Sequence, residues 1–124
     1  MRKLIKKTFE LVVFKVKINV VITDNFETYI TNNKLKQYAC PYDYFEDLSD
    51  GIGGICFDVD NFDYYILLKP DTTIGYIVHE SDHCINKIFK SRGYTLNLDN
   101  DELHAYHIGW LSEEIYNFIK EYTQ

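Results

Sequence analysis

Residues 74–93 read IGYIVHESDHCINKIFKSRG, and this stretch decides the fold that we expect for the chain. Asp71, Thr72 or Thr73 can cap a helix at its start, and Gly93 is a typical helix stop. One broad apolar stripe consists of Ile74, Ile77, Val78, Cys84, Ile85, Ile88 and Phe89. This spacing predicts an amphipathic helix with one face in the core.

Inside this helix lies an HExxH motif, His79-Glu80-Ser81-Asp82-His83. Four residues are about one helical turn, so both imidazoles leave the same face and can place nitrogens about 2 Å from one Zn²⁺. Glu80 lies one position round the helix, near the metal without binding it. There it can take a proton from a zinc-bound water, whose pKa the metal lowers, and pass it to a leaving group. The motif predicts a zinc site with two histidine ligands and a glutamate base.

A second helix is expected from Asp99 or Asn100 to about Tyr122. Its main apolar stripe consists of Ile108, Leu111, Ile115, Phe118, Ile119 and Tyr122. Glu102 shares a neighbouring face with Ala105 and Gly109, and two small residues beside a carboxylate would let another helix come close.

A catalytic zinc usually has three protein ligands and one open position, so the motif calls for a third ligand. Glu102 is the candidate, because the stop at Gly93 would return the second helix antiparallel, with its first turn over the histidines. Asp99 and Asp101 are nearby competitors. His104 ranks below the carboxylates, since it points about 200° away from Glu102 on a helix.

This layout, a helix with HExxH, a short return and a second helix that opens with a glutamate, resembles the gluzincin metallopeptidases. More narrowly, Gly53-Gly54-Ile55, the motif helix and residues 102–110 (ELHAYHIGW) look like small phage-encoded zinc peptidases, a resemblance over roughly residues 50 to 120. It implies His79, His83 and Glu102 as ligands, Glu80 as base, and a substrate peptide that adds to a hairpin strand.

Two features depart from the full-size enzymes of that family. The chain has no room for the second domain that builds their substrate cleft, and Asp82 adds a carboxylate beside His83. Tyr106 and His107 are candidate donors to the oxyanion of the reaction.

The remaining chain predicts the sheet that supports the helices. Residues 14–20 alternate between apolar and polar side chains and indicate a strand. A short helix capped by Asp24 and a Tyr-rich loop with Pro41 follow. Residues 55–59 and 64–68 predict a β-hairpin. We therefore expect one α+β domain over residues 1–124, in which a small antiparallel sheet packs on the motif helix and the C-terminal helix in a minimal gluzincin-like core. Residues 1–49 form its N-terminal part and residues 50–124 the hairpin and the zinc core.

Composition excludes several classes of protein. A net charge of −6 and a pI near 5.1 disfavour nucleic-acid binding. Arg2, Lys3, Lys6 and Lys7 precede an apolar run that is too short for a secretory signal or a membrane span. We expect a protein of the host cytoplasm or of a virion.

Three cysteines, Cys40, Cys56 and Cys84, lie far apart and form no CxxC pair. Their number is odd, so they favour small buried side chains in a reducing compartment over a disulfide framework or a cysteine zinc site.

The sequence thus predicts a zinc metallopeptidase that acts on a peptide or protein substrate. The alternative is a protein without catalysis, a virion component assembled into a phage particle or an inhibitor of a host defence, in which zinc only stabilises the fold. Glu80 argues against that alternative, because a structural site needs no base and tends to fill its fourth position with another ligand.

Overall fold

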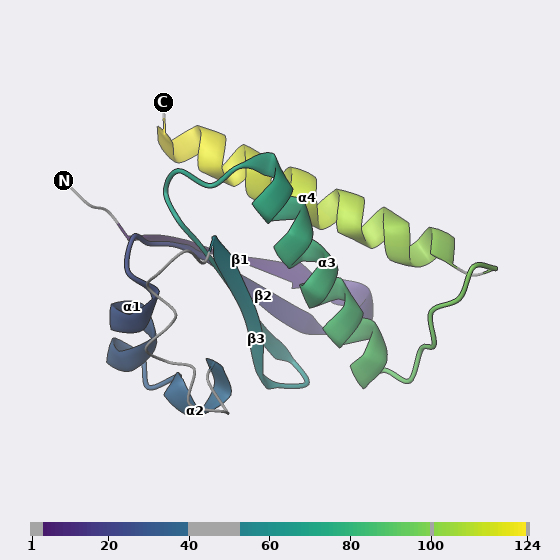
Figure 1. Cartoon of the computed structure of the whole chain (residues 1–124). Helices are drawn as coiled ribbons and strands as arrows, with labels where there is room; N and C mark the ends of the chain where they lie inside the picture. Colours follow the sequence, from purple (N-terminus) through teal and green to yellow (C-terminus); the bar gives the residue numbers. More distant parts are fainter. Residues whose placement is uncertain (1–3, 40–52, 100, 124) are drawn as a thin grey trace.

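The computed structural model describes residues 4–39, 53–99 and 101–123, and these form a four-stranded sheet with helices on both faces (Figure 1). The elements in chain order are β1 (Ile5–Leu11), the 3-10 helix η1 (Val12–Phe14), β2 (Val16–Ile22), α1 (Phe26–Asn32), α2 (Lys36–Ala39), β3 (Gly54–Asp60), β4 (Asp63–Leu68), α3 (Ile74–Ser91) and α4 (Asp101–Thr123). The predicted α+β class is confirmed.

The sheet is mixed, with the strand order β1-β2-β4-β3. Both outer pairs are antiparallel, whereas β2 and β4 run parallel. The prediction of an antiparallel sheet was therefore wrong at its centre. Parallel neighbours need a long crossover, and the connection from β2 to β4 supplies it because it includes α1, α2 and β3.

The two faces of the sheet bury different apolar sets. Val20 and Ile66 face α3 and α4, while Val21 and Leu67 face α1 and α2. Figure 1 shows the two helix pairs on opposite sides of the sheet. The alternation of β2 therefore ends at Ile18, and every residue from there to Ile22 is buried.

Strand β1 was missing from our prediction. Its basic residues suggested a leader-like segment, but Phe9 and Leu11 enter the core while Lys7 and Glu10 stay exposed. The predicted strand at residues 14–20 begins only at Val16, because Lys15 has a left-handed φ of 57° that closes η1.

The first helix is capped by Asn25 in place of the predicted Asp24. The Asn25 side chain accepts a hydrogen bond of 2.9 Å from the backbone N–H of Thr28, which satisfies one free donor of the first turn. Pro41 and most of the Tyr-rich loop predicted after this helix lie outside the described residues.

Helices α3 and α4 match the predicted positions closely. Thr73 is the residue before α3, and Gly93, with a φ of 81°, follows its end as predicted. Ile74, Val78 and Tyr122 were assigned to the core but are exposed. Within the described residues, no helix has the length and apolar character that a membrane crossing requires.

Candidate metal centre

Helix α3 presents His79 and His83 on one exposed face. Their Nε2 atoms lie 3.2 Å apart, and the rings meet edge to face with centroids 4.6 Å apart. Both histidines lie outside the core, which only the flanking Ile77, Cys84 and Ile85 enter. Exposure leaves both imidazoles open to a ligand from solvent.

The separation of the two nitrogens fits a shared metal ion. Two nitrogens bound to one tetrahedral Zn²⁺ at 2.0–2.1 Å lie about 3.3 Å apart. A hydrogen bond between the imidazoles would give a similar distance, and it differs in needing a proton on one of the two nitrogens. The rotamers of His79 and His83 thus already bring their Nε2 atoms to the spacing that a metal requires.

Glu80 lies on the side of α3 that faces β3. Its side chain is 4% exposed, and burial raises the pKa of its carboxyl group, an effect that His79 and His83 oppose. No described residue donates a hydrogen bond to it. A buried carboxyl group without a donor is costly for folding, and such perturbed groups are concentrated at functional sites.

Gly54 makes room for this carboxyl group. A Cβ atom added there would lie 2.8 Å from Cγ of Glu80 and 2.9 Å from Cδ2 of Leu68. Because β3 runs directly beside Glu80, only a glycine lets the strand and the helix approach this closely. The Gly53-Gly54-Ile55 segment noted in the sequence therefore lies against the predicted base, Glu80.

Glu102 lies exposed in the first turn of α4, and Asp99 and Asp101 are exposed too. Across the described ranges, no group of three His, Cys, Asp or Glu side chains is placed to hold a metal ion. The structure brings His79 and His83 together and does not add Glu102 to them. Its role as third ligand stays a prediction.

The small-residue face of α4 does not pack on α3 as we expected. Ala105 and Gly109 are exposed, and a Cβ atom added to Gly109 would meet nothing within 4 Å. The opposite side of the helix, with Leu111 and Ile115, enters the core. The apolar stripe sets the rotation of α4 because its burial outweighs a close approach of small residues.

His104, in the first turns of α4, faces α3. It is buried, its Nε2 donates a hydrogen bond to Oδ1 of Asn86, and its ring packs edge to face on Phe89. Asn86 follows His83 by three residues, which places it on the same face of α3. The three-residue spacing of His83 and Asn86 could have indicated Asn86 as a polar partner for α4, and the sequence analysis missed it.

The two candidate oxyanion donors lie apart from this arrangement. Tyr106 is 67% exposed and contacts the ring of His107. His107 is buried, its Nδ1 donates to the carbonyl oxygen of Leu103 at 2.8 Å, and its ring packs against Phe14 and Phe89. Phe89 follows His83 on α3, nearer the C-terminal end of the helix, so His107 packs away from the histidine pair.

Cys84 is fully buried, and its thiol interacts with that of Cys56 in β3. This contact and burial raise the pKa of the Cys84 thiol. The prediction of small buried side chains is confirmed for Cys84, and Cys56 is half-buried. Cys40 lies outside the described residues.

Comparison of the chain with protein-family models, curated proteins and solved structures gave no match.

Proposed function

We propose that the chain is a zinc-dependent hydrolase, a metallopeptidase in which His79, His83 and Glu102 hold the metal and Glu80 is the base. The observation that carries the proposal is the pair of Nε2 atoms 3.2 Å apart beside a buried glutamate. The proposal includes a gluzincin-like arrangement of the two helices in a minimal core that has no second domain.

When bound, Zn²⁺ supplies a Lewis acid for a water molecule and for the carbonyl group of a substrate. The carboxylate of Glu80 accepts the proton of the attacking water and delivers it to the leaving nitrogen. Burial raises the pKa of this carboxyl group, which brings its proton affinity closer to that needed for a transfer in both directions.

Strand β3 offers a place for the substrate. Among the described strands it lies at the edge of the sheet, and its residue Gly54 adjoins Glu80. An extended peptide that pairs with this edge would pass the base, since main-chain hydrogen bonds hold such peptides to exposed strands. The expected substrate is therefore an extended peptide or an unfolded segment of a protein.

Metal content, measured by elemental analysis of the untagged protein, tests the ligands. We expect one zinc per chain in the wild type and none in a His79→Ala/His83→Ala protein. Glu102→Ala should weaken zinc binding, whereas the neighbouring Asp101→Ala should not. If zinc is unchanged in Glu102→Ala, the third ligand is another residue, and Asp99, Asp101 and His104 are next.

A peptidase screen of wild type beside Glu80→Gln tests the reaction. General-base catalysis contributes about 10²–10⁴-fold, so we expect a loss of that size with zinc retained. Zinc binding without any hydrolysis would favour the non-catalytic phage protein, in which the metal only stabilises the fold.

A further inference from the structure

Tyr76 lies on α3 one turn before the proposed base, Glu80. Residues three and four apart on a helix are neighbours on its surface, so Tyr76 adjoins both His79 and Glu80. It is 44% exposed, whereas Glu80 is buried. Part of Tyr76 is therefore accessible to a molecule that binds at the candidate metal centre.

The ring of Tyr76 covers Gly53, the residue before β3. A Cβ atom added at Gly53 would overlap Cε1 and Cζ of this ring. At the next residue, Gly54, an added Cβ atom would lie 2.8 Å from Cγ of Glu80. Two successive glycines thus bring the start of β3 against two successive turns of α3. Both glycines are only half-buried, so their backbone remains accessible.

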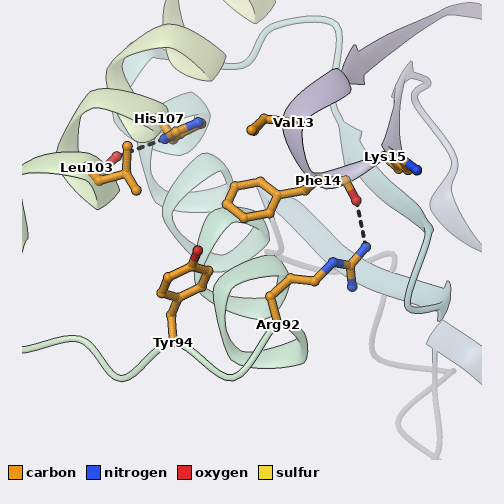
Figure 2. Close-up of a pocket in the computed structure, with 7 residues that line it drawn as sticks. All are labelled: Val13, Phe14, Lys15, Arg92, Tyr94, Leu103 and His107. Carbon is orange, nitrogen blue, oxygen red and sulfur yellow. Dashed lines mark hydrogen bonds between the residues drawn. The ribbon is translucent and has the colours of Figure 1, made fainter.

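Packing against other aromatic rings does not explain the position of Tyr76. Tyr94, just beyond the C-terminal end of α3, packs against Phe14 and Phe89 with ring centroids 6.0 and 5.5 Å apart. Figure 2 shows Tyr94 beside Phe14 in the pocket that both residues line. Among the described residues, Tyr76 has no such ring neighbour, and its ring lies on glycine backbone instead. The accessible part of this ring is therefore available to a ligand.

The direction of the Tyr76 side chain decides what it can contact. Long side chains on a helix lean toward the N-terminus of the helix, so this ring extends away from His79 and His83, which follow it. Its contact with Gly53, the residue before the one that meets Glu80, agrees with this direction. Tyr76 is thus placed to contact a side chain of the substrate rather than the reacting carbonyl group.

A peptide that pairs with the start of β3 would meet no side chain from the two glycines. In paired strands, side chains on the same face contact one another. At Gly53 and Gly54 this place is empty, and Tyr76 and Glu80 reach it from α3. A large apolar side chain of the peptide can therefore be buried against the Tyr76 ring, close to the base.

We propose that Tyr76 determines specificity, with its ring binding an aromatic or large aliphatic side chain of a peptide that pairs with the start of β3. The inference rests on the proposed function, because that function places the peptide on β3, and it adds the class of residue that the substrate must contain.

Peptide binding to Glu80→Gln, which should leave the peptide intact, tests the site without hydrolysis. Two short fluorescein-labelled peptides differ only in one central residue, Phe or Ala, and anisotropy measures their affinities for the zinc-loaded protein. We expect the Phe peptide to bind at least about tenfold more tightly, because a buried phenylalanine side chain is removed from water. Tyr76→Ala in the same background should remove most of this preference. Equal binding of the two peptides, or an undiminished preference in Tyr76→Ala, overturns the proposal.

Tyr116→Ala is the matched control, because Tyr116 is 40% exposed and lies on α4, where its ring contacts Lys120. This variant should keep the preference for the Phe peptide. Tyr76→Phe should restore the preference that Tyr76→Ala loses, since it keeps the ring. If Tyr76→Phe behaves like Tyr76→Ala, the hydroxyl group is responsible and the proposal is wrong.

Cleavage of the same two peptides separates this inference from the proposed hydrolysis. The ratio of kcat/KM for the Phe peptide to that for the Ala peptide should fall about tenfold in Tyr76→Ala, with zinc content retained. Cleavage with an unchanged ratio overturns the role of Tyr76 and leaves the hydrolysis standing. Binding that depends on Tyr76, in a wild type that cleaves neither peptide, supports the peptide site and overturns the hydrolysis.

Discussion

The four histidines of the chain form two pairs in opposite surroundings. His79 and His83 are exposed on α3, and each has its Nε2 directed at the other. His104 and His107 are buried on α4, and each donates a hydrogen bond to a protein oxygen, on Asn86 and Leu103 respectively.

The difference separates two uses of the same side chain. A buried imidazole that packs against aromatic rings and donates a hydrogen bond to a carbonyl oxygen contributes to the stability of the fold. Two exposed imidazoles with converging nitrogens contribute little to packing and are open to a ligand. Each of the following substitutions tests whether the exposed pair binds a ligand and the buried pair stabilises the fold.

The largest effect is expected on zinc affinity. Removal of both α3 histidines in His79→Ala/His83→Ala should weaken zinc binding beyond the 10–100-fold that loss of an outer-shell partner costs. His104→Ala should keep its zinc, as measured by titration with a chromophoric chelator. Loss of zinc in His104→Ala would make that histidine a ligand and would break the division.

For the free energy of unfolding, the buried histidines of α4 should matter more than the exposed histidines of α3. His107→Ala removes a buried ring that contacts Phe14 and Phe89, along with a hydrogen bond, and should lower the free energy of unfolding by about 3 kcal/mol. His83→Ala, at an exposed site, should change it by less than about 0.5 kcal/mol without zinc. Urea unfolding of both variants measures the contrast, and equal costs would refute it.

Gly54 adjoins Glu80 of the motif, and Gly109 follows His107 on α4; the two glycines should respond differently to an added methyl group. Gly54→Ala forces the methyl against Glu80 and Leu68 and should cost about 2 kcal/mol. Gly109→Ala meets nothing and should raise stability by up to about 1 kcal/mol, because alanine is the better helix former. Thermal unfolding distinguishes the two signs.

The smallest effect concerns Asn86, which connects the two helices. Asn86→Ala removes the acceptor of the His104 proton and should cost about 1 kcal/mol, with no change in zinc affinity. Lys87→Ala, at the next exposed residue of α3, is the control and should be neutral. A change in zinc affinity in Asn86→Ala would show that this contact positions the metal site.

Local patterns were sufficient to predict α3, α4 and the β3–β4 hairpin, since helical spacing, Gly93 and alternation each act over a few residues. The parallel pairing of β2 with β4 was not predictable in this way, because it joins segments that are distant in sequence and have no turn between them. Strand β1 was missed because its charged face obscured Phe9 and Leu11.

At the site, the motif correctly predicted that His79 and His83 share a face, but not that this face is exposed. Spacing fixes the angle between side chains, whereas the packing of the whole helix decides which angle points inward. The same reason explains why Glu102 is exposed. Its neighbours Ala105 and Gly109 suggested that this face of α4 contacts α3, but burial of the apolar stripe turns the face outward.

The mixed sheet also sets an order for folding. The β1–β2 and β3–β4 hairpins form between strands that are close in sequence. Val20 pairs with Ile66 only after a long loop has closed, and the entropy cost of that closure makes such pairings slow. We therefore expect the two hairpins to form first and their docking to limit the rate. In stopped-flow refolding, Val20→Ala should then slow folding more than Phe9→Ala, whose strand belongs to one hairpin alone.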